Sequence, residues 1–186
     1  ASAYHDAGRL DEAIPLLEQT LKDSTHILGP HHTDTLTSRN NLACTYQDAG
    51  RLDEAIPLLE QTLKDSTHIL GPNHPLTLTT QDNLASAYHD AGRLDEAIPL
   101  LEQTLEDRTH ILGPNHPHTL ASRNNLASAL REAGRLDEAI PLYQQTLKDS
   151  TRTLGPNHPS TLTSRNNLAS AYHDAGRLDE AIPLLE

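Results

Sequence analysis

Apolar and polar residues follow two successive helical patterns within residues 75–114. The first pattern opens at Pro75, whose ring suits the first turn of a helix and disfavours helical geometry in the residue before it. Gly92 can end the helix because glycine readily adopts the left-handed conformation. The pattern therefore predicts a helix from Pro75 to about Ala91, with one face formed by Leu78, Gln81, Leu84, Ala85 and Tyr88.

A second helix is predicted from about Asp95 to the Gly113-Pro114 stop. Asp95 and Glu96 make its first turn acidic, which complements the helix dipole. Its apolar stripe consists of Leu94, Ala97, Ile98, Leu101, Leu105 and Leu112. The short turn between the two predicted helices favours an antiparallel pair.

This two-helix pattern recurs along the whole chain. The string Arg-Leu-Asp-Glu-Ala-Ile-Pro-Leu starts every 42 residues, at Arg9, Arg51, Arg93, Arg135 and Arg177. A fixed period of this length is typical of repeat proteins, in which each unit buries its apolar face against its neighbours. The predicted fold class is therefore all-α, an α-solenoid of antiparallel helix pairs.

The repeat also predicts the domain organisation. We expect a single array over residues 1–186, with units that begin near residues 33, 75, 117 and 159. Residues 1–18 are identical to residues 169–186, so the units at both ends are expected to be truncated. The chain is interpreted as a fragment of a longer array.

Composition excludes several classes of partner. The net charge of −12, from 26 acidic and 14 basic residues, disfavours nucleic acid and anionic membrane surfaces, which bind Lys and Arg. No apolar run approaches the ~20 residues that a membrane-spanning helix needs. The single cysteine, Cys44, fits a reducing compartment, so a cytoplasmic location is predicted.

The spacing of Gln81, Leu84, Ala85 and Tyr88, followed by Gly92, Ala97 and Leu101, resembles the tetratricopeptide repeat. The period of 42 instead of 34, the linker Leu-Gly-Pro-Asn-His-Pro and the string Asn-Asn-Leu-Ala resemble the subclass found in kinesin light chains. Similar arrays occur in bacterial signalling NTPases of the STAND class. The resemblance implies a right-handed superhelix that acts as a protein-interaction module, as the sensor or scaffold part of a larger protein.

In the tetratricopeptide family the first helix of each pair lines a concave groove. The resemblance places two polar rows there: Asn40, Asp82, Asn124 and Asn166 in one, and Asn41, Asn83, Asn125 and Asn167 in the other. Family members that bind peptides use Asn at the second position to hydrogen-bond the peptide backbone. A carboxamide suits this role because it both donates and accepts. The alternative is that these amides brace neighbouring helices, and the sequence leaves both interpretations open.

Charged residues near these rows predict the chemistry of the partner. His89 and Arg131 occupy one row, beside an acidic row of Asp6, Asp48, Asp90, Glu132 and Asp174. Opposed like charges weaken association, so a neutral or basic protein or peptide is expected. Within the fourth unit, Arg131 and Leu130 differ from the residues at matching positions elsewhere.

No enzyme, metal site or cofactor is predicted. Ser86, His89 and Asp90 are the residue types of a hydrolytic triad, but adjacent residues such as His89 and Asp90 diverge around a helix. Cys44 has no cysteine partner for a zinc site, and the His residues before proline are expected to help start helices.

Two functional hypotheses follow from the sequence. The first is a module that binds a peptide or partner segment in the groove. The second is a structural scaffold, in which nearly identical repeats of different copies stack end to end.

Overall fold

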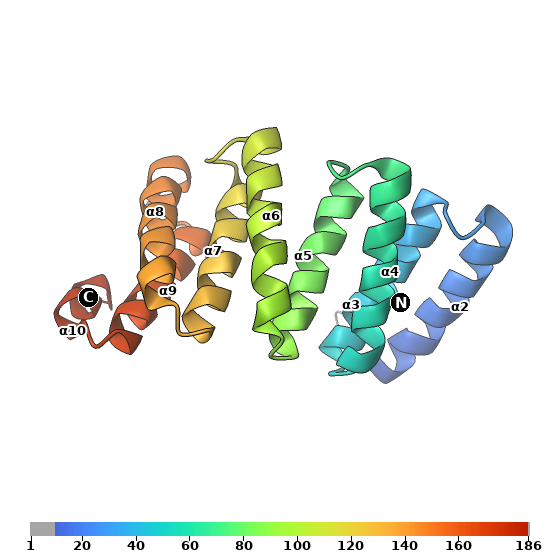
Figure 1. Ribbon diagram of the computed structural model, residues 1–186, viewed down its shortest axis with the longest axis horizontal. Coiled ribbons are helices and arrows are strands. Elements are labelled where there is room, and N and C mark those ends of the chain that lie inside the picture. Colours follow the sequence, from blue (N-terminus) through green and yellow to red (C-terminus); the bar gives the residue numbers. More distant parts are fainter. Residues whose placement is uncertain (1–9, 186) are drawn as a thin grey trace. The chain divides into compact units, whose positions relative to one another are not determined.

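The computed structural model describes residues 10–185 of the 186-residue chain. Contacts divide the chain into two compact units, residues 1–93 and residues 94–186. Each unit is a stack of helices joined by short turns (Figure 1). The described residues contain no β-strand.

The first unit contains helices α2 (Leu10–Leu28), α3 (Thr33–Asp48), α4 (Leu52–Leu70) and α5 (Pro75–Asp90). Helix α3 packs against α2, α4 and α5, and α4 also packs against α5. The turn between α3 and α4 is short, so these two helices form an antiparallel hairpin (Figure 1).

The second unit contains α6 (Leu94–Leu112), α7 (Pro117–Glu132), α8 (Leu136–Leu154), α9 (Pro159–Asp174) and α10 (Leu178–Leu185). Here α7 packs against α6, α8 and α9, and α9 packs against α8 and α10. The hairpin of α7 and α8 corresponds to that of α3 and α4 in the first unit.

Histidine caps the first helix of each pair. The Nδ1 atom of His116 accepts a hydrogen bond of 3.2 Å from the backbone N–H of His118. His74 and His158 make the same bond before Pro75 and Pro159. This cap satisfies one of the N–H groups that a helix start leaves without an intrahelical partner. The expectation that histidines before proline help to start helices is confirmed.

Glycine ends both helices of a pair. At the end of α7, Gly134 has φ of 75°, and the N–H of Arg135 donates to the carbonyl of Leu130 over 2.8 Å. Such a 6→1 bond is typical of the Schellman motif. Gly155, after α8, has φ of 93° and ψ of 159°, a combination open essentially to glycine alone.

Small residues allow the helices of each unit to approach closely. Ala43 on α3 and Ala55 on α4 are fully buried, as are Ala127 and Ala139 at the same positions of the second unit. Around them pack Leu, Ile and Tyr side chains, of which Tyr143 is the largest that is fully buried. The prediction of an all-α solenoid of antiparallel helix pairs is confirmed. The prediction of one continuous array over residues 1–186 stays a prediction.

The helix bounds follow the expected local signals. Helix α5 begins at Pro75 and ends at Asp90, and α6 runs from Leu94 to Leu112. Within α6, Pro99 lies in the second turn instead of the first, so the Asp95 carbonyl lacks the N–H donor of a regular helix. No helix between residues 10 and 185 has both the length and the apolar character required to cross a bilayer.

Candidate functional site

The predicted asparagine rows lie on the first helices of the pairs. We define the first-helix face of the first unit by residues 40 and 41 of α3 and residues 82 and 83 of α5. In the second unit it is defined by residues 124 and 125 of α7 and residues 166 and 167 of α9. The two helices of each face contact each other within their unit, so both rows cross from one helix to the next.

Exposure differs among the amides. Asn41, Asn125 and Asn166 are exposed to solvent, whereas Asn40 is only 5% exposed. The remaining members, Asp82, Asn83, Asn124 and Asn167, are half-buried. The carboxamides of Asn41 and Asn125 are therefore the members of the second row that are most open to an incoming molecule.

The two rows are joined by hydrogen bonds between neighbouring helices. In the first unit the Nδ2 atom of Asn83 donates to Oδ1 of Asn40 over 3.1 Å. In the second unit Asn167 donates to Asn124 in the same way, over 3.2 Å. These bonds brace adjacent first helices. Each donor amide keeps a second N–H and its own oxygen for other partners, so the bond does not exclude ligand binding.

A second polar link crosses each unit further along the first helices. The Nε2 atom of Gln47 on α3 donates to Ser86 Oγ over 2.9 Å and to Asp90 Oδ2 over 2.6 Å. In the second unit Arg131 Nε lies 3.5 Å from Asp174 Oδ2. Arg131, predicted to select partner side chains, is thus part of an ion pair. The acidic row is partly neutralised by the neighbouring helix.

His89 lies beside its chain neighbour. Its Nδ1 atom is 3.5 Å from Asp90 Oδ1, and the side chain is 28% exposed. The Ser86 hydroxyl accepts from Gln47, as described above, so Ser86 belongs to the link between helices. In residues 10–185 no three His, Cys, Asp or Glu side chains gather in a way that could hold a metal ion.

Buried ion pairs fix the second helix of each hairpin to the first. Arg123 on α7 donates from Nη1 to Asp149 Oδ2 on α8 over 2.9 Å and from Nη2 to the Pro114 carbonyl over 3.2 Å. Burial opposes ionisation of Asp149, but hydrogen bonds from Gln145 and Arg123 outweigh it and lower the pKa of this carboxyl. Arg39 and Asp65 form the matching pair in the first unit, with atoms 2.6 Å apart.

The sequence analysis did not identify these pairs or the Gln47 link. Their signal in the sequence is a polar residue at the same place in most repeats, namely Arg39 and Arg123 on first helices and Asp65 and Asp149 on second helices. Without the spatial arrangement, such positions cannot be told from solvent-exposed polar ones.

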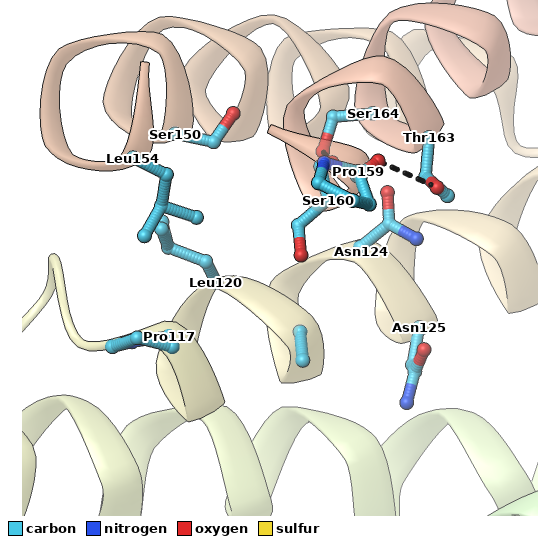
Figure 2. A pocket seen from close by; sticks show the side chains of 11 residues that line it. Pro117, Leu120, Asn124, Asn125, Ser150, Leu154, Pro159, Ser160, Thr163 and Ser164 are labelled. Carbon is cyan, nitrogen blue, oxygen red and sulfur yellow. Dashed lines mark hydrogen bonds between the residues drawn. The ribbon is translucent and has the colours of Figure 1, made fainter. Parts of the chain in front are cut away.

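A cavity of about 260 Å³ lies beside the first-helix face of the second unit. Its wall is formed by the start of α7, the end of α8 and the start of α9 (Figure 2). Asn124 is directed towards Thr163 on α9, whereas Asn125 points away from α9 (Figure 2). No charged side chain lines the cavity, which combines hydroxyl and amide groups with Leu120 and Leu154.

The stacked helix pairs and their polar first-helix faces define an interaction scaffold of the α-solenoid class. The tetratricopeptide repeat model matches residues 1–65, 45–109, 78–149 and 119–186. These matches together cover the whole chain, and the chain belongs to the tetratricopeptide repeat family.

Solved structures agree with this assignment. The nearly identical TPR-like repeats of a Podosopora anserina kinesin light chain candidate are 38% identical, with a TM-score of 0.89 over 99% of this chain and 87% of that one. A variant of that protein gives 37% identity and a TM-score of 0.91 over the same shares. BtubC (BKLC) from P. vanneervenii, at 21% identity, shares the fold with a TM-score of 0.85 over 97% of this chain and 72% of its own. No curated protein sequence matches this chain.

These findings confirm the resemblance to the kinesin-light-chain type of repeat. Tetratricopeptide repeats generally mediate protein–protein interaction or scaffolding, and the family is in general not catalytic.

Proposed function

We propose that the first-helix faces bind an extended segment of a protein partner, and that Asn41, Asn83, Asn125 and Asn167 hydrogen-bond its backbone. The observation that carries the proposal is the exposure of Asn41 and Asn125 at matching positions of the two units. An exposed carboxamide at a fixed position on a rigid helix can both donate to and accept from a peptide group. Asn83 and Asn167 add their remaining N–H and oxygen while they brace the helices.

The first row and its neighbours would complete the site. Asn40, Asp82, Asn124 and Asn166 lie next to the backbone-binding amides, where Asn40 acts through its bond to Asn83. His89 and the Arg131–Asp174 pair would contact side chains of the bound segment. The net charge of −12 favours a neutral or basic segment.

The proposal places the chain in the cytoplasm as the sensor or scaffold part of a larger protein, without catalytic activity or cofactor. The single cysteine supports the location. Burial, with the charge of Asp48 nearby, raises the pKa of the Cys44 thiol to about 11, so this group is a poor nucleophile near neutral pH.

The test is a peptide-display selection on three forms of the protein. The first is the parent, the second carries Asn41→Ala and Asn125→Ala, and the third carries Asn41→Thr and Asn125→Thr as a polar control of smaller reach. The exposed positions are chosen because their change leaves the Asn83–Asn40 and Asn167–Asn124 bonds intact. Circular dichroism must first show equal helicity.

Peptides enriched on the parent should be lost from both variants, since neither Ala nor Thr can offer two N–H donors. Enrichment that survives in both variants would exclude the role of these amides. The absence of any enriched peptide on the parent would count against binding of short segments.

A second candidate function is self-association into a scaffold. Helix α10 exposes Leu178, Ile182 and Leu185, which are 51%, 53% and 66% accessible to solvent. Apolar residues gathered on one helix favour contact with another copy. Sedimentation equilibrium over a range of concentrations distinguishes the two, because a constant monomer mass excludes the scaffold and leaves the binding module.

A further inference from the structure

The cavity beside α7, α8 and α9 has a buried floor and an exposed mouth. Ser150 at the end of α8 is 1% exposed and Ser164 on α9 is 4% exposed, and both line its floor. Ala121 and Ser160 are exposed and line its mouth. We call this cavity the Ser150 pocket. Its volume of about 260 Å³ lies below the range of pockets for whole small molecules and suits a single side chain.

The same unit contains an equivalent place that a side chain of the protein itself occupies. Arg108 on α6 stands 42 residues before Ser150 and is only 8% exposed. Its Nη1 atom donates to Ser122 Oγ over 2.7 Å and lies 3.5 Å from the carbonyl of His118. Ser122 and His118 stand 42 residues before Ser164 and Ser160.

The acceptors that hold Arg108 recur in the Ser150 pocket. Ser122 donates its hydroxyl to the His118 carbonyl over 3.1 Å while it accepts from the guanidinium. Ser164 donates in the same way to the Ser160 carbonyl, over 2.9 Å. A hydroxyl has one donor and two acceptor lone pairs, so Ser164 can accept an N–H as Ser122 does.

Other hydroxyls of the pocket are also committed as donors. Ser150 donates to the Leu147 carbonyl over 3.1 Å, and Thr163 donates to the Pro159 carbonyl over 3.0 Å (Figure 2). Their remaining capacity is to accept. The pocket therefore favours a group rich in N–H donors, and a carboxylate would find few donors to bind it.

We propose that the Ser150 pocket receives the guanidinium of an arginine side chain from the bound segment, in the position that Arg108 fills between α6 and α7. The inference rests on the proposed function for the identity of the partner as a protein segment. The pocket opens beside Asn124 and Asn125, so an arginine can enter it from a segment that lies on the first-helix face. The planar guanidinium offers five N–H donors, whereas the compact ammonium of lysine offers three.

The first experiment uses N-acetyl-L-arginine methylamide as the probe and the citrulline analogue as its uncharged match. Amide signals of Ser150, Ser160 and Ser164 in the ¹⁵N-labelled protein are followed during titration. The arginine probe should shift all three, and the citrulline analogue should bind about fivefold more weakly because its hydrogen bonds are not charge-assisted. Equal binding of the two probes, or no shift with arginine, would overturn the assignment.

Two reciprocal variants locate the binding. Ser150→Arg places in the pocket the residue that Arg108 supplies at the equivalent place, and it should abolish the shifts of Ser160 and Ser164. Arg108→Ser should create a second site, seen as new shifts at Ser122. If the Arg108→Ser protein loses helicity, the Ser150→Arg variant still decides, because unchanged shifts in it would refute the pocket.

The peptide selection separates this inference from the proposed function. Peptides enriched on the parent should carry arginine at one position, and that preference alone should vanish with Ser150→Arg. Enrichment without any arginine preference would refute the pocket and leave the binding module. Arginine binding without any enriched peptide would refute the binding module and leave the pocket.

Discussion

Replacing Asn83 should destabilise the protein, whereas replacing Asn41 should not, although both belong to the same row of amides. The Asn83→Ala change removes the 3.1 Å bond to Asn40 Oδ1. A typical hydrogen bond contributes about 0.5–1.5 kcal/mol, and an acceptor left buried without a partner costs about 1–3 kcal/mol. Because Asn40 is only 5% exposed, water replaces the lost donor poorly.

We therefore expect Asn83→Ala to lower the free energy of unfolding by about 1–2 kcal/mol. Asn41 is exposed and makes no side-chain hydrogen bond within residues 10–185, so Asn41→Ala should change it by less than about 0.5 kcal/mol. The assay is urea unfolding followed by circular dichroism, with a check that the slope of the transition is unchanged.

A double-mutant cycle with Asn40→Ala isolates the pair. The coupling energy between residues 40 and 83 should be about 1 kcal/mol, as expected for residues in direct contact. The Asn124 and Asn167 pair repeats the experiment in the second unit. Equal effects of Asn83→Ala and Asn41→Ala, or a coupling energy of zero, would refute the claim that the row braces the helices.

Three further predictions concern other features. Arg123→Met should lower the free energy of unfolding by about 3–5 kcal/mol, because Asp149 stays buried with its charge, and urea unfolding should show most of this loss restored by adding Asp149→Leu. Cys44 should react with iodoacetamide far more slowly than a free thiol near neutral pH, since its pKa is raised to about 11; mass spectrometry measures the rate, and equal rates would contradict the burial. Burial and a hydrogen bond to Glu18 raise the pKa of Tyr46 from 10.0 to about 12, so its contribution to stability is complete below pH 10.0 and is lost as pH rises towards 12. Tyr46→Phe should flatten this alkaline decline in unfolding experiments, and an unchanged decline would contradict the assignment.

The limits of the helices were determined by the sequence alone. Pro75 and Gly92 act through their own backbone geometry, and the apolar spacing between them identifies the buried face. Because these signals are local, the predicted bounds of α5 and α6 differ from those observed by one or two residues. The repeat of 42 residues then predicted the stacking of like units and, with it, the family.

The meaning of the polar rows depended on tertiary structure. Asn41 and Asn83 occupy the same position of the repeat, yet Asn41 is exposed and Asn83 bonds to Asn40 on the neighbouring helix. Residues 43 positions apart can bond in this way only because α3 and α5 pack at a particular register. No local signal specifies that register, so bracing and binding could not be separated from the sequence.

The Ser150 pocket shows the same division. The difference between Arg108 and Ser150 is visible in the sequence as one substitution between otherwise similar repeats. The tertiary structure reveals that Arg108 enters the space between neighbouring helices and bonds to Ser122, and that Ser150 leaves a cavity at the equivalent place. Sequence determines which residue stands at each position of a repeat, whereas the packing of neighbouring helices decides whether its side chain fills a space, joins two helices or faces solvent.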